Sequence, residues 1–247
     1  MANGKYEFTG ETMQWKGRTL RHIRALNDIH CHDVRAGYVG GWIEGEGNLS
    51  TYGNAWVCDD AKVFGDAQVC GDARVYGNAT VCDNAMVCGN ASVCGNVMVC
   101  DNAWVSGNAW VSNNATVGGA AMVYGRAWVY DNATVCGDAR VDGAARVCGD
   151  AKVGGAARVC GDAEVGGNAE VMQSGDYIVV KNCWSSMRWF TYTRSNRKWS
   201  VGGFYGTGEE LIEKAYADSE TSGRCYEAIV RAVESIENAT AGKGDAK

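Results

Sequence analysis

The chain has 247 residues, a net charge of −6, no proline and 12 cysteines. The acidic balance argues against nucleic acid or an anionic membrane as a partner, since both attract clustered Lys and Arg. No apolar run reaches the roughly 18 residues of a membrane span, and the N-terminal sequence lacks the regions of a signal peptide, so we expect a cytoplasmic protein whose cysteines are free thiols.

Residues 1–50 are expected to form a β-rich cap. Three short strands are predicted there, over residues 6–8, 13–15 and 19–26. Turns are expected at Gly10 and at Lys16 and Gly17. Residues 40–44 then lead into residues 48–50, which form a degenerate repeat. The end of a stacked β-structure exposes unpaired strand edges, so a cap is physically required there.

A six-residue repeat occupies the middle of the chain, predicted to be a solenoid over residues 51–172. Valine recurs without a slip from Val57 to Val171, which gives 20 valines in one phase. Alanine stands two residues before each of them, with Val97 as the exception, so the unit is Ala-x-Val-x-Gly-Asn/Asp. Ala and Val share one face of a strand, and Gly-Asn or Gly-Asp turns the chain. Stacked units therefore bury a continuous column of valine and alanine.

Residues 173–238 are predicted to form a small α+β domain, followed by a disordered tail over residues 239–247. Three strands are expected, over residues 176–183, 188–193 and 198–201. A helix capped by Thr207 is expected to run to Asp218, because Glu210 completes a capping box. A second helix is expected over residues 224–238. Its apolar face holds Ala228, Ile229, Ala232, Val233 and Ile236.

Several stretches resemble known families. The unit Gly-Asn-Ala-Trp-Val-Cys is similar to the repeat of hexapeptide proteins, which implies an all-β solenoid, a left-handed parallel β-helix with three hexapeptides per coil. Residues 24–26, 40–44 and 48–50 are similar to the leading segment of prophage and enterobacterial hexapeptide proteins described as acyltransferases. Trp-Phe-Thr at residue 189 and Gly-Phe-Tyr-Gly-Thr at residue 203 resemble an α+β module of many phage proteins. The resemblance implies a protein of phage or prophage type, located in the host cytoplasm if it is phage-encoded.

The resemblance also raises the question of catalysis. Hexapeptide acyltransferases use a histidine as general base near a loop that interrupts the prism, and they trimerise to form the acyl-CoA site. Here His22, His30 and His32 all lie before the repeat, and the repeat carries no looped insertion. A general base must lie within hydrogen-bond reach of the bound nucleophile. We therefore predict no catalytic residue and no cofactor, with a divergent acyl-CoA-dependent acyltransferase as the alternative.

Possible metal and redox groups are the segment His30-Cys31-His32-Asp33 and the cysteines of the repeat. On a strand the two histidines would share one face, but a transition-metal site usually needs three or four convergent ligands. We predict no metal site. Nine cysteines each follow a repeat valine and are expected to fill a corner as small, soft residues, with redox or metal storage left open.

Outward-facing aromatic and methionine side chains gather on the central coils, on two of the three walls given by an 18-residue coil. They exceed what a monomer normally exposes and belong to types enriched in interface cores. We predict that seven residues form a contact surface: Met86, Trp104, Trp110, Met122, Tyr124, Trp128 and Tyr130. The expected partner is a second copy of the chain; an external partner or stacking along the strand column are the alternatives.

These observations predict a non-catalytic binding and scaffold protein. It is expected to self-assemble as a homo-oligomer and to bind or sequester a host protein or a small ligand. Neither nucleic acid nor a membrane is an expected partner, and the identity of the partner does not follow from the sequence.

Overall fold

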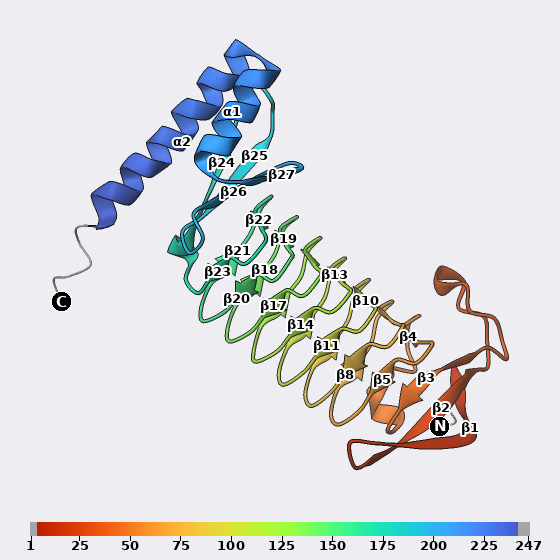
Figure 1. Ribbon diagram of the computed structural model, residues 1–247. Coiled ribbons are helices and arrows are strands. Elements are labelled where there is room, and N and C mark those ends of the chain that lie inside the picture. The colour runs from red at the N-terminus through yellow and green to blue at the C-terminus, as the bar shows by residue number, and fades with distance from the viewer. Residues whose placement is uncertain (1–3, 242–247) are drawn as a thin grey trace.

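The computed structural model describes residues 4–241 and has the shape of a rod (Figure 1). The hairpin of β1 (Tyr6–Trp15) and β2 (Arg18–Ala25) lies at one end, and helices α1 (Gly208–Asp218) and α2 (Glu220–Ala241) lie at the other. A parallel solenoid connects the two ends. Within residues 4–241, neither helix is long and apolar enough to cross a bilayer.

The solenoid has three walls of short parallel strands. The first wall holds β4 (Trp56–Val57), β7 (Arg74–Val75), β10 (Ser92–Val93), β13 (Trp110–Val111), β16 (Trp128–Val129), β19 (Arg146–Val147) and β22 (Glu164–Val165). The second holds β3 (Val39–Ile43), β5 (Lys62–Val63), β8 (Thr80–Val81), β11 (Met98–Val99), β14 (Thr116–Val117), β17 (Thr134–Val135), β20 (Lys152–Val153) and β23 (Glu170–Val171). The third holds β6 (Gln68–Val69), β9 (Met86–Val87), β12 (Trp104–Val105), β15 (Met122–Val123), β18 (Arg140–Val141) and β21 (Arg158–Val159). Residues 18 apart are opposite each other, as Trp110 and Trp128 are, so the predicted coil of three hexapeptides is confirmed.

The interior of the solenoid is the predicted column of valine and alanine. All 20 repeat valines have no exposed surface, and the alanine positions, Val97 included, are at most 1% exposed. Close stacking at the corners requires glycine or a short polar residue in left-handed backbone. At Gly107, φ is 67° and a Cβ atom would come within 2.9 Å of the Gly125 backbone nitrogen. Asp101 and Asn113 adopt the same conformation at equivalent corners.

Asparagine side chains at one corner form a ladder along the rod axis. The amide of Asn78 donates to Asn96, Asn96 to Asn114 and Asn114 to Asn132, with nitrogen–oxygen distances of 3.0–3.1 Å. Asn132 then donates to a carboxylate oxygen of Asp150 at 2.9 Å. At this corner the polar residue that ends the hexapeptide therefore joins successive coils as well as turning the chain.

The N-terminal cap extends the second wall. β1 is one strand through Gly10, whose φ of 93° accompanies a register shift in its pairing with β2. The predicted turn at Gly10 is therefore wrong, because the residue forms a bulge. Lys16 and Gly17 form the predicted turn, with φ values of 49° and 77°. β3 pairs antiparallel with β2 and parallel with β5, which places the hairpin on the solenoid edge.

The solenoid begins one coil before the regular phase. Ile43 and Leu49 are fully buried and lie opposite repeat valines of the next coil. The predicted degenerate repeat at residues 48–50 is thereby confirmed. Eight residues rather than six separate Leu49 from Val57, and the extra length forms an exposed corner at Tyr52. In the short helix η2 (Glu46–Asn48), the Asn48 amide donates to the carbonyls of Gly65 and Ala67 at 2.9 Å.

The C-terminal module is an antiparallel sheet covered by two helices. After η3 (Ser174–Asp176), its strands follow chain order: β24 (Tyr177–Lys181), β25 (Trp189–Thr193), β26 (Lys198–Val201) and β27 (Phe204–Gly206). The first three strands were predicted and β27 was not. Thr207 caps α1 as expected, and the Thr207 N–H donates to Glu210 Oε2 at 2.7 Å.

Helix α2 is longer than predicted at both ends, because it starts at Glu220 and ends at Ala241. The prediction of a disordered tail is wrong for residues 239–241, which continue the helix. The rest of the predicted tail, residues 242–247, lies outside the described residues.

The module's sheet closes the end of the solenoid. Backbone N–H groups of the strands point toward this end, and in the last coil three of them donate to hydroxyls. Glu164 donates to Thr191 Oγ1 at 2.9 Å, Glu170 to Ser195 Oγ at 2.7 Å and Arg158 to Ser174 Oγ at 3.2 Å. At the end of each wall, one serine or threonine hydroxyl therefore accepts a hydrogen bond from a backbone N–H that would otherwise be unpaired.

Candidate functional site

Five of the seven predicted contact residues form an apolar surface on adjoining walls. We call Met86, Trp104 and Met122 on the third wall, with Trp110 and Trp128 on the first, the central band. The three tryptophans are 44%, 41% and 47% exposed in chain order. The rings of Trp110 and Trp128 tilt at 34° with centroids 5.9 Å apart. The period-two strand explains this placement, because each residue immediately precedes an inward valine.

Polar contacts at the tryptophans leave their rings on the surface. The indole N–H of Trp104 donates to Cys88 Sγ at 3.0 Å. The Arg146 guanidinium lies 5.7 Å from the Trp128 ring centroid, which is a cation–π contact. The exposed surface of the central band is therefore largely apolar. Arg146 borders it on the side of the C-terminal module.

Tyr124 and Tyr130, the other two predicted residues, occupy corners rather than wall faces. The Tyr124 hydroxyl donates to Asp142 Oδ2 at 2.9 Å, and the same oxygen accepts from Arg158 Nε at 2.9 Å. Burial, and then the hydrogen bond to Asp142, raises the pKa of Tyr124. Burial, and then its hydrogen bond to Cys148, likewise raises the pKa of Tyr130. Both tyrosines are half-buried and contact groups one coil away, so they support the stack.

Two outward positions differ from the simple pattern. Met98 on the second wall is 37% exposed and was not among the predicted contact residues, although its outward position in the repeat could have indicated it. Trp56 has an outward position on the first wall but is fully buried. Ile29 and Val34, from the β2–β3 connection, belong to the same apolar cluster as Trp56. The cap therefore covers the first wall at this end.

The three histidines do not converge. The His22 ring stacks on Trp42 at 4.1 Å, and its Nδ1 lies 3.0 Å from Glu11 Oε2. His30 and His32 lie in a 3-10 helix, η1 (His30–His32), rather than on a strand, so the shared strand face considered from the sequence is absent from this segment. His30 is exposed, whereas burial, followed by the charge of Arg74, lowers the pKa of the half-buried His32.

One corner brings together Asp83, Cys100 and Asp101, whose potential ligand atoms lie within 4.8 Å of one another. These groups bond to each other: the Asp101 N–H donates to Asp83, and the Cys100 thiol donates to Asp101 at 3.6 Å. Burial, followed by the neighbouring carboxylates, raises the pKa of Cys100 to about 11. The hydrogen bond from the Asp101 N–H to Asp83 joins two successive coils at this corner.

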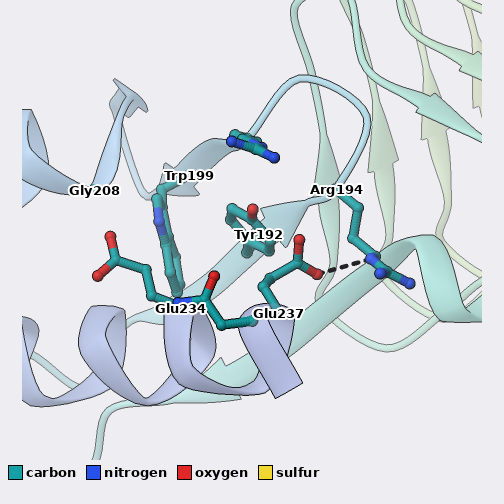
Figure 2. A pocket seen from close by; sticks show the side chains of 8 residues that line it. Tyr192, Arg194, Trp199, Gly208, Glu234 and Glu237 are labelled. Atoms are coloured by element: carbon teal, nitrogen blue, oxygen red, sulfur yellow. Dashed lines mark ion pairs between the residues drawn. The ribbon is translucent and has the colours of Figure 1, made fainter. Parts of the chain in front are cut away.

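A hollow of about 430 Å³ lies between the module's sheet and the C-terminal half of α2 (Figure 2). Tyr192 and Trp199 face it from β25 and β26, with ring centroids 5.1 Å apart. An ion pair of 2.7 Å between Arg194 and Glu237 ties the sheet to the helix at its side. Glu234 pairs with Arg231 at 2.9 Å. Of these two ion pairs, the one between Arg194 and Glu237 joins α2 to the sheet, and the one between Glu234 and Arg231 lies within α2.

The fold and the repeat define a β-solenoid repeat protein. A family model described as the YdcK β-solenoid repeat matches residues 67–83, which is nearly one coil. No curated protein matches the chain. The similarity therefore supports the repeat architecture, and the suggested phage or acyltransferase relationship stays a prediction.

Proposed function

We propose that this protein is a non-catalytic scaffold that assembles with copies of itself through the central band. The observation that carries the proposal is the surface of Trp104, Trp110 and Trp128, each more than 40% exposed on neighbouring coils. Tryptophan is strongly enriched among residues that dominate binding energy at interfaces. Several large apolar side chains exposed on neighbouring coils are typical of a protein–protein contact site.

The residues that flank the central band support the same proposal. On the N-terminal side the outward positions are Gln68 on the third wall and Ser92 on the first. On the C-terminal side they are Arg140 and Arg146. An apolar centre with a polar rim is the usual anatomy of an interface. Binding of a host protein or a small ligand, in a host cytoplasm, is a further expectation for a chain of phage type.

Replacing Trp104 or Trp110 with glutamate should dissociate the assembly. Wild-type protein at micromolar concentration should sediment as a multiple of 26.3 kDa, and each variant should sediment as a 26.3 kDa particle. A charge at the centre of an apolar interface is desolvated without a partner, which disfavours association. Sedimentation velocity measures this, with the thermal melt as a check on folding.

Thr116→Glu is the matched control for these variants, since Thr116 is an outward residue of the adjacent strand on the second wall. It should assemble like the wild type. Wild-type protein that sediments at 26.3 kDa in the same range would contradict self-assembly through the central band.

Acetyl-CoA should leave the melting temperature unchanged. A ligand that binds the native state raises it by mass action, and the three histidines, which lie outside the walls, provide no general base along the repeat. Differential scanning fluorimetry with millimolar acetyl-CoA measures this. A dose-dependent rise, together with acetyl transfer to an amine or hydroxyl acceptor, would favour the acyltransferase alternative over the scaffold.

A further inference from the structure

A pocket of about 250 Å³ lies where the C-terminal module meets the solenoid, and we call it the junction pocket. The first wall contributes Arg146 and Glu164, and the preceding corner contributes Asp162. The module contributes Arg188, Trp189 and Ser200. The pocket therefore combines side chains from the solenoid and from the C-terminal module.

Ser200 supplies a buried hydroxyl in this pocket. It is 4% exposed, and its Oγ has no hydrogen-bond partner among the described residues. Ser200 is directly opposite Thr191 in the β25–β26 pair, so the two side chains lie on the same sheet face. Thr191 Oγ1 accepts from the Glu164 N–H at 2.9 Å, which shows that this face is turned toward the solenoid. Since buried hydroxyls are nearly always paired, Ser200 offers a hydrogen bond to a ligand.

Four charged side chains surround the same pocket without neutralising one another. Arg146 and Glu164 are opposite each other on neighbouring strands, and Asp162 and Arg188 line the pocket beside them. Within residues 4–241, none of the four forms an ion pair. Two cations and two anions that are not paired with each other match a ligand that carries both charges.

We infer that the junction pocket binds a free α-amino acid with an aliphatic side chain. The arginines suit its carboxylate, which accepts charge-assisted hydrogen bonds, and Asp162 and Glu164 suit its ammonium group. Trp189, 37% exposed, and Met187 provide apolar surface for the side chain. A volume of about 250 Å³ leaves room for a small molecule such as an amino acid. Arg146 also flanks the central band, whereas the other residues of the pocket lie outside that surface, and the inference does not depend on self-assembly.

Isothermal titration calorimetry of the full chain with L-leucine tests the inference. Saturable heat with one site per chain is expected. Arg188→Gln should weaken binding about tenfold or more, the change expected for loss of one charge-assisted hydrogen bond. Ser200→Ala should also weaken binding. Arg140→Gln, an outward arginine of the third wall, is the control and should bind like the wild type.

Two analogues test the requirement for both charges: 4-methylpentanoate lacks the ammonium group and leucinamide lacks the carboxylate. Each should bind at least about tenfold more weakly than leucine, since each loses the charge-assisted hydrogen bonds of one of its two charged groups. Absence of saturable heat with millimolar L-leucine would overturn the inference. So would an Arg188→Gln variant, folded by its thermal melt, that binds leucine with wild-type affinity.

Discussion

Val117→Asp should lose about 4 kcal/mol or more of its free energy of unfolding, enough to prevent folding at ambient temperature in a marginally stable chain. Val117 is fully buried on the second wall, between Val99 and Val135 of the neighbouring coils. A carboxylate there would have no partner among the surrounding valine and alanine side chains, and burial of an unpaired charge is among the costliest substitutions known. Chemical denaturation followed by circular dichroism measures the change.

Thr116→Asp is the matched control, because Thr116 precedes Val117 on the same strand and points outward. Its effect should stay within about 0.5 kcal/mol, as for most surface substitutions. An equal loss of unfolding free energy in the two variants would contradict the assignment of Val117 as inward and Thr116 as outward. A larger loss in the Thr116 variant would indicate that Thr116 is the inward residue.

A chain truncated after Met172 should form aggregates of increasing size, whereas the full-length chain should form a particle of fixed mass. The truncation removes the hydroxyls of Ser174, Thr191 and Ser195, which accept backbone N–H groups of the last coil. It also removes Tyr177 and Val179, which pack against the solenoid core. An uncovered strand edge with apolar side chains is a template for further pairing. Light scattering should show a mass that rises continuously with concentration.

A second variant separates this end effect from assembly through the central band. Val165→Lys in the truncated chain places a charge at the open end, a device by which proteins block edge-to-edge association. It should restore a concentration-independent mass. A truncated chain that stays monodisperse and keeps the full-length melting temperature would show that the module is not needed as a cap.

The solenoid could be predicted from the sequence because its information is local and repeated. Each valine has an alanine two residues before it and a turn after it, so one hexapeptide specifies which side chains face inward. The phase from Val57 to Val171 then assigns every outward residue to a wall. The capping box of Thr207 and Glu210 is similarly local, and α1 begins where it predicts.

Features that depend on distant pairing could not be predicted in this way. Trp56 occupies an outward position, yet the cap buries it. Lys62 is also outward but only 8% exposed, with its ammonium 4.7 Å from the Trp15 ring centroid. Nothing in the hexapeptide indicates that the N-terminal cap would fold back over these positions. The bulge at Gly10 lies in the hairpin that covers Lys62.

The candidate sites also differ in whether local sequence or contacts between distant segments determine them. The sequence located Trp104, Trp110 and Trp128 on the outer surface, because wall position follows from the phase alone. The sequence did not distinguish Tyr124 and Tyr130 from these tryptophans. The two tyrosines lie at corners, where their hydroxyls form hydrogen bonds with the next coil, and the phase of the repeat does not reveal those bonds. The junction pocket depends on the docking of one sheet face against the last coil, which has no signature in either segment.

A cryo-electron microscopy or crystal structure of the assembled particle would show directly whether copies of the chain meet through the central band. We expect Trp104, Trp110 and Trp128 to lose their exposed surface to contacts between copies, on adjoining first and third walls. A particle whose copies meet elsewhere, with these three indole rings still open to solvent, would contradict it.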